Sequence, residues 1–335
     1  MLEQAFLNFG YTKEEFERIR NTYPINTLKD ETLLNNFENI TKFLLNNGYT
    51  KADIIKMSDR IPALFSYSIE NLKQKIDYLM SLGFTKTNII KITKKVPSVF
   101  SLGIDSIQHK LSYLESLGFN KEEILKMIKT FPSIFSYGTK NIDQKIEDLE
   151  KIGYKREEII KMFKKLPSLL GSSLESLTQR VDFLLKIGYT KQEVISITKQ
   201  LPTLLRYSIE NMEQKISDLM SLGYTEEEVI KITKSLPAIY GLSIEKIKEK
   251  IALYKVIGID KIVVVNTKYI MQSNELTYAR YAFLSDKGIT INMDNCSQIF
   301  KSNKKFEKQY GITKEELLDK YKYEDYLESQ KEIIK

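Results

Sequence analysis

The sequence predicts an all-α solenoid made of tandem 35-residue units, each a helix, a short turn and a second helix, stacked into a superhelix. Two ladders of residues carry this prediction. The seven prolines are separated by one interval of 38 residues and then five of 35: Pro24, Pro62, Pro97, Pro132, Pro167, Pro202 and Pro237. A glycine lies 14 residues before each of them, and one more continues the ladder: Gly10, Gly48, Gly83, Gly118, Gly153, Gly188, Gly223 and Gly258. Two ladders in phase indicate a tandem array.

The first helix of each unit is predicted from its start and stop signals. We count repeat positions from the glycine as zero. A Thr or Asn at position 2 and a Glu at position 5 form a capping box, as in Thr190 with Glu193. Apolar residues at positions 6, 7, 9 and 13 follow helical spacing. The proline at position 14 cannot donate into the helix, so we expect a helix over positions 3–12, which is 51–60 after Gly48.

The second half of the unit is predicted to hold one tight helical turn and then the second helix. Position 20 offers an N-cap in four units: Ser68, Ser173, Ser208 and Ser243. Apolar residues at positions 21, 24, 28, 31 and 34 form one stripe, and the next glycine suits the left-handed residue that ends a helix. One unit cannot bury both apolar faces alone, so neighbouring units must stack.

The repeat pattern divides the chain into four segments. Residues 1–47 form an N-terminal capping repeat, 48–257 form six regular repeats, and 258–311 form divergent C-terminal repeats. Residues 312–335 are expected to form a charged C-terminal helix or tail.

The composition argues against catalysis and metal binding. The chain of 335 residues has one histidine and one cysteine, and no phosphate-binding loop or nucleophile–base pair. We interpret His109 as an exposed polar residue and Cys296 as a buried or incidental thiol. We therefore expect no enzyme, no metal and no cofactor.

The hydropathy of the chain and its N-terminal residues predict where in the cell the protein is located. No apolar run approaches the roughly 18 residues of a membrane helix, so no membrane span is expected. The N-terminal residues lack signal-peptide and transit-peptide features. The expected location is the cytoplasm, of bacterial type, or an organelle matrix if a transit peptide has been removed.

The charge distribution favours a polyanionic partner. The net charge is +7, and residues 48–257 hold 33 basic against 25 acidic side chains. An excess of positive charge in the regular repeats is expected of a nucleic-acid-binding surface. A solvated Lys/Glu surface is the alternative.

Two sets of cations recur at fixed positions, and equal positions align when repeats stack. On the second helix, position 27 is basic in six successive units: Lys75, Lys110, Lys145, Arg180, Lys215 and Lys250. On the first helix, positions 8, 11 and 12 face away from the apolar positions and are often basic: Lys56, Arg60, Lys91, Lys94, Lys95, Lys126, Lys129, Lys161, Lys164, Lys165, Lys199, Lys231 and Lys234. Each set predicts a row of phosphate contacts, because lysine suits the nucleic-acid backbone better than base edges.

Each set also has an alternative interpretation. Position 27 flanks the apolar stripe, where an aliphatic stem covers the core or the head forms an ion pair. The first-helix cations could be a solvated face. Arg180, Arg206 and Arg280 are the candidates for sequence-specific contacts.

The aromatic residues recur as well. Position 1 is aromatic in every regular unit and is expected to join consecutive repeats, with base stacking as the alternative. No role is assigned to the tyrosines at position 19, which occur in alternate repeats: Tyr67, Tyr137 and Tyr207.

These motifs resemble one known family. Pentatricopeptide repeats share the length, but their Gly and Pro lie close together. The unit from Gly118 to Phe135, GFNKEEILKMIKTFPSIF, and the helix from Ser208 to Gly223, SIENMEQKISDLMSLG, closely resemble the repeat of the mitochondrial transcription termination factor (mTERF) family. The segment 278–288 resembles the family's closing Pro-Arg-Tyr element, with Ala279 where proline is usual, and 302–310 resembles its terminal helix.

The resemblance implies a left-handed all-helical arch that binds nucleic acid along a basic concave groove. Double-stranded DNA is the preferred ligand, with an effect on transcription through termination or regulation. Structured RNA or ribosomal RNA, and a peptide-binding scaffold with no nucleic-acid role, are the alternatives. A monomer is expected, with a possible protein partner at the C-terminal region.

Overall fold

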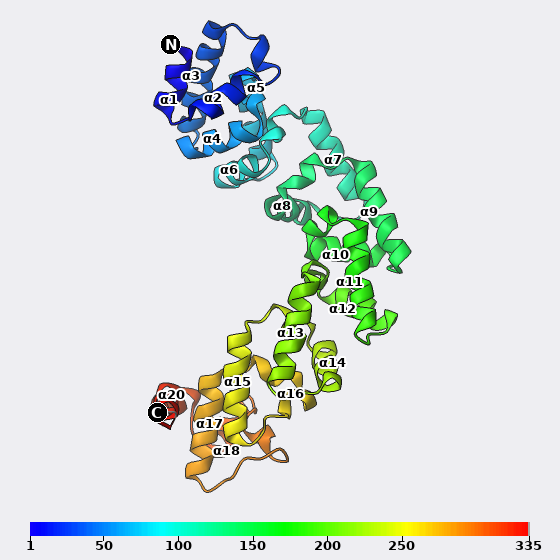
Figure 1. The fold of residues 1–335 in the computed structure, drawn as a ribbon, viewed down its shortest axis with the longest axis vertical. Helices are drawn as coiled ribbons and strands as arrows, with labels where there is room; N and C mark the ends of the chain where they lie inside the picture. Colours follow the sequence, from blue (N-terminus) through cyan, green and yellow to red (C-terminus); the bar gives the residue numbers. More distant parts are fainter. Residues whose placement is uncertain (334–335) are drawn as a thin grey trace. The chain divides into compact units, whose positions relative to one another are not determined.

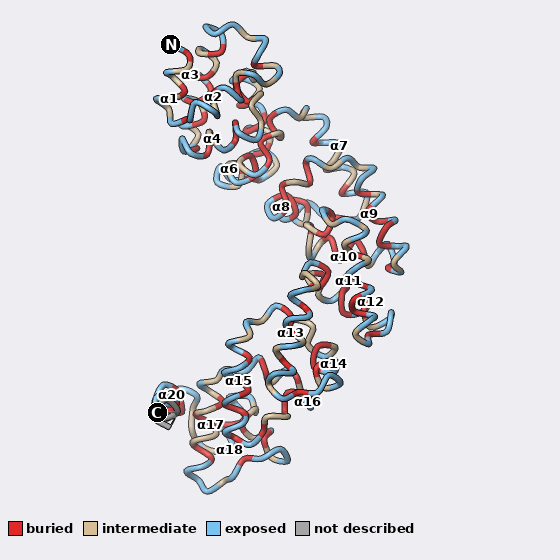
Figure 2. Tube along the Cα trace, in the orientation of Figure 1, coloured by how far each residue is buried: buried red, intermediate tan, exposed pale blue. Residues whose placement is uncertain are grey.

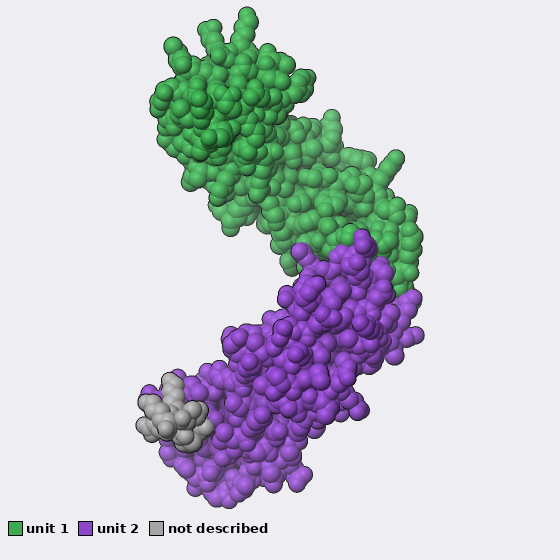
Figure 3. All heavy atoms as spheres, in the orientation of Figure 1, with its two compact units in different colours: residues 1–174 green, residues 175–335 purple. Residues whose placement is uncertain are grey.

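The computed structural model describes residues 1–333, and over this range its secondary structure is entirely helical (Figure 1). The chain forms two compact units, Met1–Leu174 and Glu175–Lys335 (Figure 3). Each unit is described by itself below. The predicted all-α repeat architecture is confirmed in both.

The first helix of every regular repeat occupies the predicted positions 3–12. Unit 1 contains α4 (Lys51–Arg60), α6 (Lys86–Lys95), α8 (Lys121–Thr130) and α10 (Arg156–Lys165), and unit 2 contains α12 (Lys191–Gln200) and α14 (Glu226–Ser235). The predicted capping box is present at α12, where Thr190 Oγ1 accepts from the Glu193 amide and the Glu193 carboxylate accepts from the Thr190 amide. A capping box of the same kind, formed by Thr50 and Asp53, caps the N-terminus of α4.

The proline of each repeat opens the predicted tight turn, a 3-10 helix. In unit 1 these are η2 (Pro62–Ser66), η3 (Pro97–Ser101), η4 (Pro132–Ser136) and η5 (Pro167–Gly171), and in unit 2 they are η6 (Pro202–Arg206) and η7 (Pro237–Gly241). Proline suits this place because its fixed φ matches a helical start and its missing donor would have no partner there.

The second helices follow directly. They are α5 (Ile69–Ser81), α7 (Ile104–Ser116), α9 (Thr139–Ile152), α11 (Leu174–Lys186), α13 (Ile209–Ser221) and α15 (Ile244–Ile257). Ser68, Ser208 and Ser243 accept from backbone amides as predicted N-caps. The ladder glycines that follow the second helices have φ between +81° and +124°, including Gly10 after α1, which confirms the left-handed helix ends.

The two chain ends add shorter elements. Unit 1 begins with α1 (Leu2–Phe9), α2 (Lys13–Arg20), η1 (Ile25–Thr27) and α3 (Asp30–Asn46). Unit 2 ends with α16 (Ile262–Val265), η8 (Thr267–Met271), α17 (Asn274–Asp286), η9 (Cys296–Gln298), α18 (Asn303–Tyr310), α19 (Lys314–Lys320) and α20 (Tyr323–Ile333). Both α19 and α20 pack against α17.

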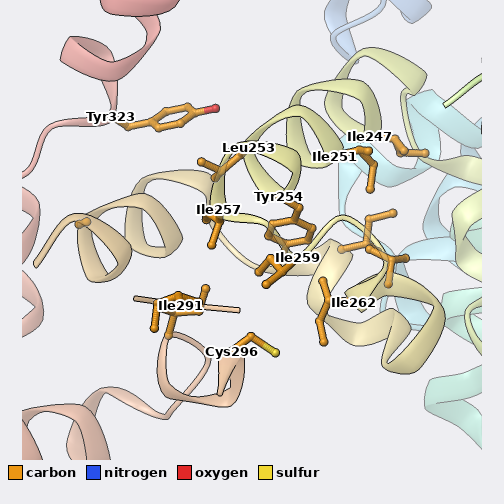
Figure 4. Close-up of a cluster of buried hydrophobic side chains, with 14 of the residues drawn as sticks. Ile247, Ile251, Leu253, Tyr254, Ile257, Ile259, Ile262, Ile291, Cys296 and Tyr323 are labelled. Atoms are coloured by element: carbon orange, nitrogen blue, oxygen red, sulfur yellow. The ribbon is translucent and has the colours of Figure 1, made fainter. Parts of the chain in front are cut away.

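The apolar faces of the helices are buried between repeats (Figure 2). In unit 2 the core surrounds Tyr254, which is fully buried against Ile251, Ile259 and Ile262 (Figure 4). Cys296 lies in the same cluster and is 4% exposed, so it is a buried thiol.

The aromatic residues at position 1 join consecutive repeats. The rings of Tyr49 and Phe84 are 3% exposed. The Tyr11 hydroxyl is 2.7 Å from Ser58 Oγ, and the Tyr49 hydroxyl is 2.7 Å from Thr93 Oγ1, in each case at position 10 of the next repeat. The predicted joining role is confirmed for these tyrosines.

The position-19 tyrosines lie over a small residue of the next repeat. A side chain at Gly171 would meet the Tyr137 hydroxyl, because an ideal Cβ there is 3.1 Å from that oxygen. A side chain at Gly241 would collide with the ring of Tyr207. Position 18 is therefore glycine in the repeats that follow these two tyrosines.

Candidate nucleic-acid interface

The cations at position 27 lie in the interior of each unit. Lys75, Lys145, Lys215 and Lys250 are between 4% and 9% exposed, and Lys110 and Arg180 are partly buried. Their aliphatic stems lie beside the apolar stripe of the second helix. This placement matches the alternative in which the stem covers the core.

The heads of four of these cations bind the turn of the next repeat. Lys110 Nζ donates to the carbonyls of Ile134 and Phe135, both at 2.9 Å, and also to that of Tyr137. In unit 2, Arg180 Nε donates to the Tyr207 carbonyl at 2.7 Å, and Lys215 Nζ donates to the Leu242 carbonyl at 2.6 Å. Lys250 makes the equivalent bond to Gln272.

Most of these carbonyls lie at the C-terminal ends of the 3-10 helices, where the last acceptors have no partner within the helix. A cation there also complements the negative end of the helix dipole. Burial lowers the pKa of Lys110 and of Lys250 to about 8, so both remain charged at pH 7. Lys145 lies 3.7 Å from the Asp148 carboxylate. We therefore assign the position-27 row to repeat stacking and leave it out of the interface proposed below.

The cations at position 11 also join repeats. Lys164 Nζ lies 2.7 Å from Glu123 Oε2 and 2.8 Å from the Gly118 carbonyl oxygen, and Lys234 Nζ lies 3.0 Å from Glu193 Oε2. Lys94 forms the same ion pair with Asp53. In each case the cation reaches the capping box of the preceding repeat.

The position-11 lysines also cover the aromatic rings at position 1. The Lys164 ammonium is 5.4 Å from the centre of the Phe119 ring, and that of Lys234 is 5.3 Å from Tyr189. The hydrogen bond from Lys164 holds the pKa of Glu123 below its usual value. We call this lysine, ring and carboxylate arrangement the position-11 clamp.

The clamp between α6 and α8 lacks its acid. Lys129 lies over the Phe84 ring, 5.9 Å from its centre, but position 5 of the preceding repeat is Asn88. We expect Asn88→Glu to raise the free energy of unfolding by roughly 0.3–0.5 kcal/mol, because it completes an exposed ion pair at a capped helix start.

The gain depends on pH in a defined direction. The folded-state pKa of the clamp acid is lowered, as for Glu123, so the stabilisation is present above the unfolded pKa and is lost as pH falls through the folded pKa. Denaturant titrations at pH 7 and pH 3 measure this difference. Asn88→Gln serves as the control, and an equal gain from Gln contradicts the ion-pair explanation.

Positions 8 and 12 of the first helices carry a set of exposed cations. In unit 1 these are Lys56, Lys91, Lys126 and Lys161 at position 8, with Arg60, Lys95 and Lys165 at position 12. Lys231 is the exposed position-8 cation of unit 2. We call these eight residues the helix-face cations.

One of the helix-face cations, Arg60, contacts the following repeat. Arg60 Nη1 donates to the carbonyls of Lys94 and Lys95 at 3.1 and 2.9 Å, at the C-terminal end of α6. Its guanidinium therefore lies beside the backbone of Lys95.

The remaining candidates separate into exposed and buried residues. Arg206 is exposed at the end of η6, and Lys199 is partly buried on α12. Arg280 is 3% exposed: Nη1 donates to the Ile299 carbonyl at 3.0 Å, and Nη2 donates to Asn303 Oδ1 at 2.8 Å. The expectation that Arg280 reads base edges is revised, because the side chain is buried and its Nη1 and Nη2 donors bind groups within the fold.

Comparison with known proteins gives one family. A model of the mTERF family matches residues 4–147 and 136–307. No curated protein matches the chain. Over the described residues, every helix is too short or too polar to cross a bilayer.

Proposed function

The chain belongs to the mTERF family, and from that premise we propose that it binds nucleic acid, with double-stranded DNA as the preferred ligand, through phosphate contacts of the helix-face cations. Family membership suggests a nucleic-acid-binding helical-repeat protein. The exposure of the helix-face cations supports the proposed contact set, and most of the cations at positions 11 and 27 bind groups of neighbouring repeats instead.

The choice of side chains favours backbone contact. Seven of the eight helix-face cations are lysines, which act as point charges on phosphate oxygens and do not form the bidentate pairs that read guanine. Binding of this kind is strongly salt-dependent and largely independent of sequence.

The burial of the position-1 rings favours a duplex over a single strand. Proteins that bind single strands without sequence preference expose aromatic rings on which bases stack. Here Tyr49, Phe84, Phe119 and Tyr154 are 3–4% exposed and face the neighbouring repeat. The helix-face cations therefore offer charge without a stacking platform.

The proposed biological effect follows from the presence of the bound protein on DNA. A protein held on duplex DNA by phosphate contacts acts where it is bound, and we propose that it affects transcription, through termination or regulation, without catalysing a reaction. Structured RNA is the alternative ligand, and the test below includes it.

A salt titration of the full chain tests the proposal. Binding to a labelled 30-base-pair DNA is followed by fluorescence anisotropy between about 50 and 300 mM salt. If six to eight phosphates are neutralised, the logarithm of the affinity falls with the logarithm of salt at a slope of about −5 to −7. A slope near zero contradicts the proposal.

Two controls accompany the titration. Competition with duplex RNA and single-stranded DNA of equal length shows which ligand binds best, and tighter binding of RNA contradicts the preference for DNA. Lys215→Met removes a position-27 cation that binds the Leu242 carbonyl, and we expect it to leave the slope unchanged. A slope reduced by about one unit would show that Lys215 contacts a phosphate, and position 27 would then belong to the interface.

A further inference from the structure

The helix-face cations are distributed unequally between the two units. We propose that the first helices of unit 1, α4 to α10, make the phosphate contacts, and that the first helices of unit 2 do not. This inference rests on the proposed function and assigns it to residues 51–165. Each unit is considered by itself, so the argument needs no knowledge of how they are arranged.

In unit 1 the basic pattern is complete at position 8. Each of α4, α6, α8 and α10 carries an exposed lysine there, and α4, α6 and α10 add an exposed cation at position 12. These two positions are four residues apart, so they lie on one face of each helix. Each of these helices therefore presents one or two cations to the same side.

Helix α6 is the most basic of the four. It carries Lys86, Lys91, Lys94 and Lys95 and has no acidic residue. Thr87 and Asn88 occupy positions 4 and 5, where α8 and α10 have glutamates. Arg60 adds its guanidinium at the C-terminal end of α6. Among these four helices, α6 therefore has the largest net positive charge.

In unit 2 most of the same positions are occupied by uncharged residues. Helix α12 has Ser196 at position 8 and Gln200 at position 12, and α14 has Ser235 at position 12. The shortened α16, with the sequence Ile-Val-Val-Val, ends in Val265, which is 70% exposed. At these positions a nucleic acid would meet hydroxyl, amide and apolar groups.

The helix that carries the single position-8 lysine of unit 2 is acidic at its start. Glu226, Glu227 and Glu228 occupy the first turn of α14, one acidic residue more than in the first turns of α8 and α10. Helix α14 has three acidic and two basic residues, whereas α6 has four basic residues alone. The net charge of α14 is thus unfavourable for a polyanion.

The length of the contact follows from helix packing. Packed helices lie about 8–10 Å apart, so four successive first helices span roughly 30 Å between the outer axes. At about 3.4 Å per base pair, this span corresponds to roughly one turn of duplex. The proposed ligand is therefore a duplex of about 10 base pairs and not one that needs the whole length of the array.

Two charge-matched sets of substitutions in the full chain test the assignment. The first set is Lys56, Lys91, Lys126 and Lys161→Gln in unit 1. The second is Lys191, Lys246, Lys248 and Lys255→Gln in unit 2, which removes the same charge from side chains that are also exposed and lie outside the helix-face cations. Thermal unfolding confirms that both variants fold.

The salt titration described above is repeated for both variants on the 30-base-pair DNA. We expect the first set to reduce the slope by about 3 units and to weaken binding at least tenfold at 100 mM salt, while the second set changes affinity less than threefold. Equal losses in the two variants, or a larger loss in the second, overturn the inference. A wild-type slope near zero would instead remove the proposed function itself, so the two failures are distinguishable.

A duplex-length series gives an independent readout. Duplexes of 10, 14, 20 and 30 base pairs are titrated against the wild-type chain at fixed salt. We expect the 14-base-pair duplex to bind within fivefold of the 30-base-pair duplex. Affinity that continues to rise steeply up to 20 base pairs or beyond overturns the assignment to unit 1.

Discussion

Substitution of Tyr254 by alanine is expected to lower the free energy of unfolding of unit 2 by about 4 kcal/mol, in the range measured for large aromatic residues in cores. The side chain is fully buried in the cluster of Figure 4, and its hydroxyl donates to the Tyr269 carbonyl at 2.6 Å. Alanine leaves a cavity between α15 and α16 and removes the donor to η8. Both losses act on the last repeats of the array.

Tyr254→Phe separates the two contributions. Phenylalanine keeps the ring packing and loses only the hydroxyl, so we expect a cost of about 1–2 kcal/mol from the unpaired carbonyl. Urea unfolding of the three proteins, followed by circular dichroism, gives the comparison. If the phenylalanine variant loses as much as the alanine variant, the hydrogen bond and not the ring volume is what stabilises this cluster.

Substitution of Arg280 by leucine is expected to cost about 3 kcal/mol. The guanidinium lies 4.6 Å from the centre of the Phe306 ring and donates to Ile299, Lys301 and Asn303. Leucine fills part of the volume but leaves three buried or partly buried acceptors without this donor. The segment from η9 to α18 should then detach from α17.

The local nature of this effect allows a direct measurement. Stability in repeat proteins is a sum of local terms, so hydrogen exchange of the amides in α18 should accelerate while those of unit 1 stay protected. Arg206→Leu, at an exposed position of the same unit, should change stability by less than about 0.5 kcal/mol. Exchange that is unchanged in α18 contradicts the structural role of Arg280.

The fold was accessible from the sequence because its signals are local and repeat. A Thr or Asn at position 2, a proline at position 14 and a glycine at position 35 each act on the backbone within one turn. The first helices begin and end where these signals predict, as at Lys51 and Arg60 of α4. Repetition removed the ambiguity that a single proline or glycine would leave.

The roles of the cations were less accessible because their partners lie in other repeats. The head of Lys215 binds the carbonyl of Leu242, and a backbone carbonyl has no signature in the sequence. The sequence showed a recurring charge at position 27 but not the acceptor that it faces. Arg280 was misplaced for the same reason, since two of its acceptors are backbone carbonyls of residues 299–301.

The position-11 clamp had a signal that could have been found. The acid at position 5 recurs with the lysine at position 11 of the following repeat, as Glu123 with Lys164 and Glu193 with Lys234. Opposite charges separated by a constant 41 residues indicate facing side chains once the stacking is known.

The fit of Tyr137 over Gly171, and of Tyr207 over Gly241, has a consequence for how such an array can change its length. The first tyrosine of the series, Tyr67, is followed by Ser101 instead, so the glycine requirement is confined to residues 118–257. Deleting residues 153–187 would bring Tyr137 against Arg206, and deleting residues 188–222 would leave Gly241 beside Ser172. Within residues 118–257, loss of repeats should therefore proceed two at a time.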